Sequence, residues 1–267
     1  MWGAIIGDLI GSIYEYDQTK KFHKLDLSDK NLPDELITKE SFFSDDTILT
    51  IAALDAILNN GSYEEYLKMY ALKYEDNIPK DIPYFKKMFS GGFLNWVKTG
   101  KNNNSTGNGA LMRLSPVAYL FNDYIKLNEN LFLLTNCSHH SSEALSSAYL
   151  MGQIIYYARK RMTKDEIIDK LNIKIEYKDF NKFNMSCFDT IGNCLYALFT
   201  SDSYIEAVKK VISYGGDTDT NACITGAMAE AMYTVDDSLI EKAKEKLPDE
   251  FISKLDKGYS LIKKIDC

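Results

Sequence analysis

The sequence is poor in the residues that bind soft metals or form disulfide bonds. Its 267 residues include three histidines and five cysteines, and the cysteines are scattered along the chain without C-x-x-C spacing. An odd number of unpaired cysteines indicates neither a disulfide framework nor a zinc ribbon. We therefore expect buried thiols in a reducing compartment, which favours a cytoplasmic protein.

Long apolar runs and an excess of basic residues are also missing. No run of about 18 uncharged apolar residues occurs, so no transmembrane helix is expected. The apolar N-terminal segment contains Asp8 and has no basic region before it, which argues against a signal peptide. A net charge of −7 disfavours the basic surfaces that bind nucleic acid or anionic membranes. We expect a small molecule or a modified protein as the partner, and a monomer is a reasonable expectation.

Alternation of apolar and polar residues, the pattern of half-buried strands, is almost absent. Only residues 173–177 weakly indicate a strand. Helix starts are indicated by four capping-box patterns: Ser62 with Glu65, Thr163 with Glu166, Ser203 with Glu206, and Ser238 with Glu241. These signals predict an all-α fold. No linker, low-complexity tract or repeat of fixed period divides the chain, so residues 1–267 are expected to form a single domain.

The segment GGDTDTNACITGAMAEAMY, residues 215–233, places two aspartates between a pair of glycines and an apolar helix. The glycines allow a tight turn, and the following apolar residues recur at helical spacing. Asp217 and Asp219 would lie at the start of the helix, where the positive end of the helix dipole favours carboxylates. Simple helix capping explains this pattern as well as a functional site does.

A second segment of the same construction shifts the balance toward function. In SFFSDDTILTIAALDAIL, residues 41–58, Ser44, Asp45, Asp46 and Thr47 precede a helix that is apolar on most faces. Such a helix belongs in the middle of a core. Two carboxylate-bearing helix starts would then meet inside the protein, where unneutralised charges are costly.

A cation is the simplest way to hold these four carboxylates together. Neither segment contains a lysine or arginine, and the side chains offer only hard oxygen donors. Such donors suit Mg²⁺, Mn²⁺ or Ca²⁺ better than zinc. The sequence therefore predicts a carboxylate-bridged site, with two divalent cations as the expected occupancy.

The first segment, MWGAIIGDLIGSIYEYD, predicts a helix that begins almost at residue 1. Glycines recur every four residues in it, and their cost in a helix interior suggests that another helix approaches closely. Asp8, Ser12 and Glu15 share one face of this predicted helix. They form either one wall of a site or a solvated outer face.

Four further segments show recognisable patterns. In the segment Gly107, Asn108 and Gly109, backbone N–H groups are able to face an anion, and a helix is expected from Ala110. A plain loop is the simpler interpretation of this segment. His139 and His140 are predicted to begin a helix. Residues 187–199 predict another apolar helix, and the lysine-rich tail from Asp236 predicts two amphipathic helices at a solvated edge.

Taken together, the motifs resemble those of the ADP-ribosylglycohydrolase family, whose members are similar to the dinitrogenase-reductase-activating glycohydrolase. The matching pieces are GDLIGSIYE (7–15), SDDT (44–47), GNGALMR (107–113), SHHSS (138–142) and GGDTDT (215–220). They occur in the family's order and span nearly the whole chain. The resemblance implies a compact, single-domain orthogonal helix bundle with a central site for two Mg²⁺ ions, with Mn²⁺ as an alternative.

The resemblance also implies roles for individual residues. The metal ligands would be Ser44, Asp45, Asp46, Asp217, Asp219 and Thr220. Glu15 would face the scissile bond, while His139 and the loop of Gly107, Asn108 and Gly109 would line the ADP-ribose pocket, with the backbone N–H groups of that loop holding the diphosphate.

The implied reaction is hydrolysis of the glycosidic bond between ADP-ribose and an acceptor, which passes through an oxocarbenium-like transition state. Glu15 or a metal-bound aspartate, Asp46 or Asp217, would be the catalytic acid or base, and the sequence does not rank them. The acceptor is open between an arginine or serine side chain of an ADP-ribosylated protein and a small ADP-ribose conjugate. The alternatives are a non-catalytic ADP-ribose binder or immunity-type protein, a metal-dependent phosphohydrolase and a calcium-stabilised scaffold.

Overall fold

The computed structural model describes residues 1–265 apart from 16–34, 81, 83–84, 102–103 and 179–183. The helices are α1 (Trp2–Gly11), α3 (Asp45–Leu58), α4 (Tyr63–Tyr74), α5 (Gly91–Thr99), the 3₁₀ helix η1 (Asn108–Ala110), α6 (Ser115–Leu120), α7 (Tyr124–Asn136), α8 (Ser142–Arg159), α9 (Lys164–Leu171), α10 (Cys187–Phe199), α11 (Tyr204–Ile212), α12 (Thr218–Met232), α13 (Asp237–Lys244) and α14 (Asp249–Ile265). Within these ranges no β-strand occurs, and an isolated bridge joins Gly107 and Ser186. The predicted all-α fold is confirmed.

Most of the predicted helix starts are confirmed by their caps. Ser62 and Ser203 accept from the backbone N–H of Glu65 and Glu206, and Thr163 forms the complete capping box. The predicted start at Ser238 is wrong by two residues, because the Asp236 carboxylate accepts from Ser238 N and caps α13 instead. The weak strand pattern at 173–177 gives no strand.

Three other predicted boundaries also move. α8 begins at Ser142 with Ser141 as its cap, so His139 and His140 lie in the connection before it. No α-helix starts at Ala110, where η1 ends, and α6 begins at Ser115. α1 ends at Gly11, so Glu15 lies beyond a turn rather than on the same helical face as Asp8.

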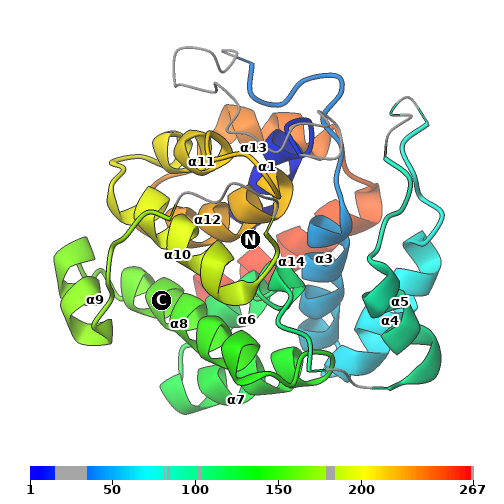
Figure 1. Cartoon of the computed structure of the whole chain (residues 1–267), viewed down its shortest axis with the longest axis horizontal. Helices are drawn as coiled ribbons and strands as arrows, with labels where there is room; N and C mark the ends of the chain where they lie inside the picture. Colours follow the sequence, from blue (N-terminus) through cyan, green and yellow to red (C-terminus); the bar gives the residue numbers. More distant parts are fainter. Residues whose placement is uncertain (16–34, 81, 83–84, 102–103, 179–183, 266–267) are drawn as a thin grey trace.

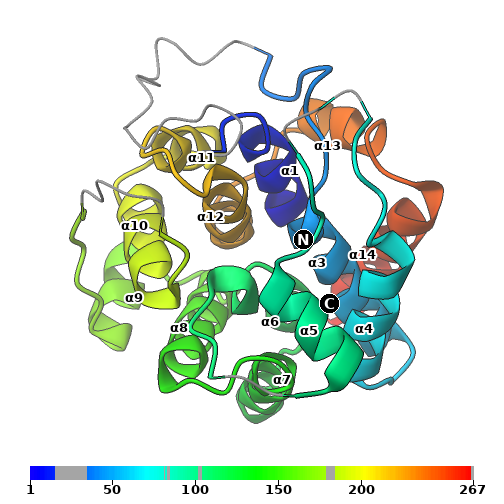
Figure 2. The same cartoon turned by 45° about the vertical axis from the view of Figure 1, so that its right-hand side comes forward.

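The contact between α1 and α12 is the closest helix packing near the middle of the molecule (Figures 1 and 2). The two helices run antiparallel, because Gly3, Gly7 and Gly11 face Gly226, Ala222 and Thr218 in reverse order. A Cβ atom placed at Gly7 would lie 2.1 Å from the carbonyl oxygen of Ala222. The glycine repeat of the first segment therefore serves the predicted close approach of a second helix.

Helix α3 packs on the other side of α1 and is buried along most of its length. Its neighbours include α4, α6 and α14, which cover its apolar faces. Because both α3 and α12 lie in the core, their N-terminal ends meet inside the protein. Among the described residues, no helix is long and apolar enough to cross a membrane.

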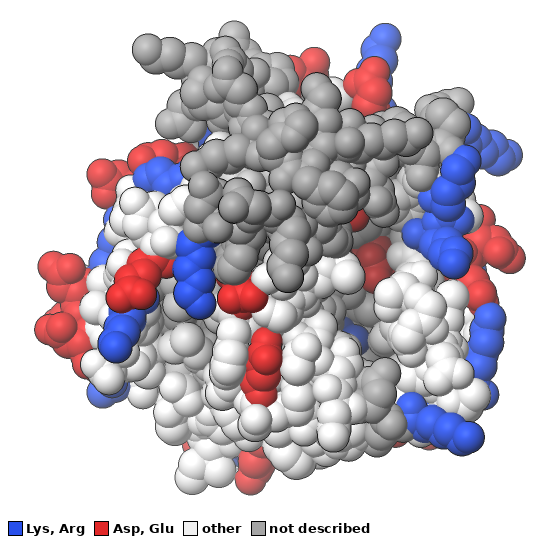
Figure 3. All heavy atoms as spheres, viewed as in Figure 1, with Lys and Arg blue, Asp and Glu red and all other residues white. Residues whose placement is uncertain are grey.

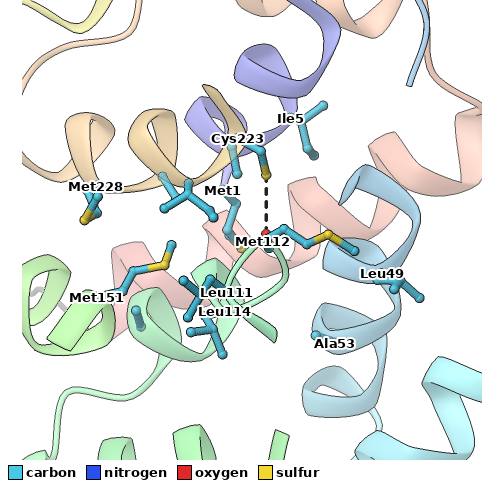
Figure 4. Packing of buried hydrophobic residues seen from close by; sticks show 14 of the residues in the cluster. Met1, Ile5, Leu49, Ala53, Leu111, Met112, Leu114, Met151, Cys223 and Met228 are labelled. Carbon is cyan, nitrogen blue, oxygen red and sulfur yellow. Dashed lines mark hydrogen bonds between the residues drawn. The ribbon is translucent and has the colours of Figure 1, made fainter. Parts of the chain in front are cut away.

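The segment that follows η1 is tied to both central helices through one carbonyl group. Met112 O accepts from Thr50 Oγ1 of α3 at 3.1 Å and from Cys223 Sγ of α12 at 3.4 Å. Figure 4 shows this second contact, with Met1, Met151 and Met228 packed nearby. The carbonyl group of Met112 thus ties this buried segment to both α3 and α12.

Replacing Gly7 with alanine tests the α1–α12 contact. We expect Gly7→Ala to lower the free energy of unfolding by about 2–3 kcal/mol or more, since overpacking against rigid backbone outweighs the gain in helix propensity. Gly192→Ala in α10 is the matched control, because a Cβ atom there meets nothing within 4 Å. Urea unfolding should show that only the first variant is destabilised, and equal stability of the two variants would contradict the close contact.

Candidate active site

The N-terminal end of α3 is built around two acidic side chains and a buried carboxylate beneath them. Ser44 caps the helix, and its Oγ accepts from Asp46 N at 3.1 Å and donates to Asp46 Oδ2. Asp8 Oδ2 of α1 accepts from Ser44 N, from Thr47 N and from Thr47 Oγ1, at 3.0, 3.2 and 2.5 Å. Asp8 therefore fixes the position of the α3 terminus that carries Asp45 and Asp46.

The N-terminal end of α12 follows a left-handed turn. Gly215 and Gly216 have φ angles of 73° and 79°, a conformation that L side chains rarely adopt. Asp217 is the cap residue of α12, and the Asp219 carboxylate accepts from Thr220 N at 2.7 Å. The glycine pair thus turns the chain so that both aspartates lie at the positive end of α12.

The two helix ends meet in the interior. Thr220 Oγ1 donates to Asp46 Oδ2 at 3.2 Å. Two groups of carboxylates have oxygens within 4.8 Å of one another: Asp8 with Asp46 and Asp219, and Glu15 with Asp217 and Asp219. Asp219 belongs to both groups and lies between them.

Burial and mutual repulsion make this cluster costly without a cation. Burial, and then the neighbouring Asp219, raise the pKa of Asp8 to about 7. Burial raises the pKa of Asp46 and of Asp219 well above the usual range, with further contributions from nearby aspartates. Among the described residues, no lysine or arginine forms an ion pair with Asp8, Asp46, Asp217 or Asp219.

Two buried oxygens of the cluster have no hydrogen-bond partner. They are Asp8 Oδ1 and Asp46 Oδ1. Unpartnered buried carboxylate oxygens, all-oxygen donors and the missing counter-charge together fit a hard divalent cation such as Mg²⁺ or Mn²⁺. The residues present can therefore hold the metal that the sequence predicts.

A cavity of about 460 Å³ opens beside the cluster. One side is acidic, with Glu15, Asp45, Asp217 and Asp219. Another part of the lining is aromatic, formed by Phe85, Phe89, Phe93 and Trp96. Figure 3 shows a hollow in this face beside α5, with acidic and basic atoms visible within it. A ligand with a polar end and a flat aromatic end would match these two sides.

Most of the predicted site residues line this cavity: Glu15, Asp45, Gly107, Asn108, Gly109, His139, Asp217, Asp219 and Thr220. Ser44 and Asp46 do not line it. They are 1% exposed and lie behind Thr220, where they support the acidic side.

Backbone N–H groups of the glycine loop, which were expected to bind the diphosphate, are largely hydrogen-bonded to other protein groups. Gly107 N donates to Ser105 Oγ at 3.1 Å, and Asn108 N donates to Met185 O at 2.7 Å. The Asn108 side chain donates to Asp217 Oδ2 at 2.6 Å, which orients that carboxylate. The loop therefore positions Asp217 and forms a wall of the cavity, and two of its backbone N–H groups already have partners within the protein.

Several residues of the site were not predicted as such. Asp8 was expected only as one wall of a site, and the structure places it within the carboxylate cluster. The aromatic side of the cavity gave no periodic signal, because its members come from a loop and one face of α5. Arg113 belongs to the GNGALMR motif, and its charge in an apolar context was the signal that could have identified it.

Comparisons with known proteins identify the family of the chain. A family model described as ADP-ribosylglycohydrolase matches residues 1–265. The L543 protein of Acanthamoeba polyphaga mimivirus, provisionally named an ADP-ribosyl glycohydrolase, is 26% identical over 280 residues, covering 86% of this chain and 84% of the relative. The ADP-ribosylhydrolase ARH3 of Mus musculus is 20% identical, covering 86% of this chain and 82% of its own length.

A bacterial relative and a solved structure are also similar. The ADP-ribosylarginine hydrolase Tri1 of Pseudomonas putida (strain GB-1) is 21% identical, covering 87% of this chain and 69% of its own length. A solved chain titled ADP-ribosylglycohydrolase-related protein complex superposes with a TM-score of 0.69 at 16% identity, covering 98% of this chain and 94% of that one. At that identity the superposition establishes the shared fold alone.

Metal addition should stabilise the protein. At a concentration about 100 times the Kd, Mg²⁺ or Mn²⁺ adds about 2.7 kcal/mol to the free energy of unfolding, which is roughly 5–10 °C in Tm. The double variant Asp217→Asn, Asp219→Asn should lose this shift yet be no less stable in EDTA, because repulsion is removed. Glu129→Gln on the exposed surface of α7 is the control and should keep the full shift. An unchanged wild-type Tm on metal addition would contradict the site.

His139 should make stability depend on pH. Burial, then Arg113 and His140, lower the pKa of His139 to about 3 from 6.5. The unfolded chain therefore binds a proton below pH 6.5 that the folded protein does not, so stability falls as the pH falls toward 3. Relative to His139→Gln, wild-type protein should lose about 2 kcal/mol between pH 7 and pH 5. Equal slopes for the two proteins in urea unfolding would refute the burial of a neutral imidazole.

Proposed function

This chain belongs to the ADP-ribosylglycohydrolase family and is an ADP-ribosyl glycohydrolase, and we propose that it uses two divalent cations to release ADP-ribose from an ADP-ribosylated acceptor. The observation that carries the proposal is the pair of carboxylate groups that share Asp219 at the edge of the cavity. One group faces the cavity and the other lies beneath it. Such an arrangement can hold one ion against the substrate and a second ion behind it.

Asp45, Asp217, Asp219 and Thr220 are the ligands closest to the cavity. Ser44 and Asp46 complete the donor set from behind, and Asp8 holds the α3 terminus in place. When bound, Mg²⁺ would orient hydroxyl groups of the ribose and lower the pKa of a bound water.

Protein groups must also manage a proton at the scissile bond. Glu15 and Asp217 both line the cavity, whereas Asp46 does not. Of the three candidates, Asp46 is therefore the least suited to act as the acid or base. Asp217 is oriented by Asn108 and is assigned above as a metal ligand, so we propose Glu15 as the acid or base.

The two sides of the cavity support ADP-ribose as the bound unit. Aromatic rings can stack on an adenine base, and the acidic side can bind a ribose through metal ions. The cavity volume of about 460 Å³ lies within the range of small-molecule sites. The acceptor is an arginine or serine side chain of a modified protein, or a small conjugate.

The key experiment measures release of free ADP-ribose from arginine-linked and serine-linked ADP-ribosylated peptides, with Mg²⁺ and with EDTA. We expect release only with the metal, and the better peptide identifies the acceptor. Glu15→Gln should lower kcat by about 10²–10⁴-fold, the usual contribution of a general acid or base. Glu129→Gln should leave kcat unchanged.

A non-catalytic binder is the competing function. It predicts that ADP-ribose binds with a measurable Kd while neither peptide is cleaved in any metal. Calorimetry with ADP-ribose, run beside the release assay, separates the two. Binding without release from both peptides would reject the hydrolase for these acceptors.

A further inference from the structure

A row of three polar side chains, Arg113, Ser138 and His139, runs from the interior to the cavity. Arg113 Nη2 donates to Ser138 Oγ, and Ser138 Oγ lies 2.8 Å from Nδ1 of His139. All three residues line the cavity, yet their exposed fractions are only 0, 3 and 7%. Such a buried row has few ways to arrange its protons.

The direction of the first hydrogen bond is fixed by chemistry. A guanidinium group has donors only, so Ser138 Oγ must accept from Arg113. The serine hydroxyl then has a single proton left to give. A hydroxyl that accepts from a cation is polarised and becomes a better donor itself.

The histidine ring offers the nearest strong acceptor for that proton. The neighbouring Cys137 Sγ is a weak acceptor and itself donates to Leu134 O at 3.1 Å. A lone pair on Nδ1 would face the positive guanidinium, with the N–H bond of the ring on the far side. The reverse arrangement would point an N–H dipole toward a buried cation.

The other ring nitrogen lies at the cavity wall. A Cβ atom placed at Gly107 would be 3.7 Å from His139 Nε2, so this nitrogen lies beside the glycine loop. The backbone of His139 is held by its N–H, which donates to Thr135 O at 2.9 Å. Backbone and Nδ1 together fix the position of the ring.

We propose that Ser138 is a positioning residue that holds His139 as the neutral Nε2–H tautomer, so that Nε2 donates a hydrogen bond to an oxygen of the bound ADP-ribose. The ligand in this inference rests on the proposed function, whereas the tautomer does not. Burial and the charge of Arg113, which lower the pKa of His139, also keep the ring neutral at physiological pH. The site therefore gains an uncharged donor that stays fixed beside the acidic cluster.

His140 provides an internal comparison. Its Nδ1 lies 2.9 Å from Asn136 Oδ1, which can only accept. His140 must therefore carry a proton on Nδ1, the opposite of the state proposed for His139. Two adjacent histidines should thus differ in their protonated nitrogens within one protein.

Nitrogen-15 NMR of histidine-labelled protein at about pH 7 tests the tautomer directly. The three histidines give few signals, and His139→Gln assigns those of His139. We expect Nδ1 in the range of an unprotonated nitrogen and Nε2 in the range of an N–H nitrogen. A protonated Nδ1 on His139 in the wild-type protein, either as the other tautomer or as imidazolium, would overturn the proposal without reference to any substrate.

Variants of Ser138 test the positioning role. Ser138→Ala should populate the Nδ1–H form of His139 and raise the Kd for ADP-ribose by about 10–100-fold, the usual effect of losing a hydrogen bond to a charged group. Ser138→Thr keeps the hydroxyl and should restore both the tautomer and the Kd. An unchanged tautomer and Kd in Ser138→Ala would overturn the relay.

A third result separates this inference from the proposed function. If wild-type protein shows the Nε2–H tautomer but does not bind ADP-ribose in calorimetry, the ligand half of the inference and the proposed function both fail. If ADP-ribose binds and is released from peptides while Ser138→Ala leaves both the tautomer and the Kd unchanged, the hydrolase stands and the inference fails.

Discussion

The antiparallel contact between α1 and α12 is the constraint on which the rest of the structure depends. It sets Asp8 of one helix beside the N-terminal end of the other, because Gly7 and Gly11 allow the backbones to touch. Thr218 Oγ1 then donates to Gly11 O at 2.8 Å, so that α12 begins beside the C-terminal end of α1. This contact sets the positions of Asp217 and Asp219 at the start of α12. The N-terminal end of α3 is hydrogen-bonded to Asp8 of α1. One tight backbone contact therefore positions Asp8, Asp217 and Asp219 and, through Asp8, the start of α3.

The carboxylate cluster is an unfavourable arrangement that the surrounding fold maintains. Two helix dipoles point their positive ends at it, yet two buried oxygens lack partners and no basic side chain of the described residues pairs with Asp8, Asp46, Asp217 or Asp219. A divalent ion would supply the positive charge that the side chains of the protein do not provide there. Elsewhere in the cavity lining, Arg113 donates to Ser138 and Ser138 contacts Nδ1 of His139, the arrangement from which we infer a neutral imidazole. The cavity thus combines a place for cations with an uncharged donor.

Local patterns in the sequence predicted the helices and the helix ends that carry aspartates. The bounds of α10 match the prediction, and the glycine repeat predicted a close helix neighbour. Features that depend on distant parts of the chain were missed or misjudged. The N–H of Asn108 is bonded to Met185, and Asp8 lies under α3, because residues far apart in the sequence pack there. Asp236, and not Ser238, is the N-cap of α13, because an aspartate two residues earlier offers an equally good acceptor.

The α1–α12 contact also bears on how the protein is made. Thr218 and Gly11 are 207 residues apart in the chain, and a ribosome adding about 5–20 residues per second needs roughly 10–40 s to synthesise that interval. During this time the apolar residues of α1 exist without the helix that packs against them. The nascent chain must therefore shelter an aggregation-prone helix until α12 emerges, which makes synthesis the stage at which a chaperone would matter most.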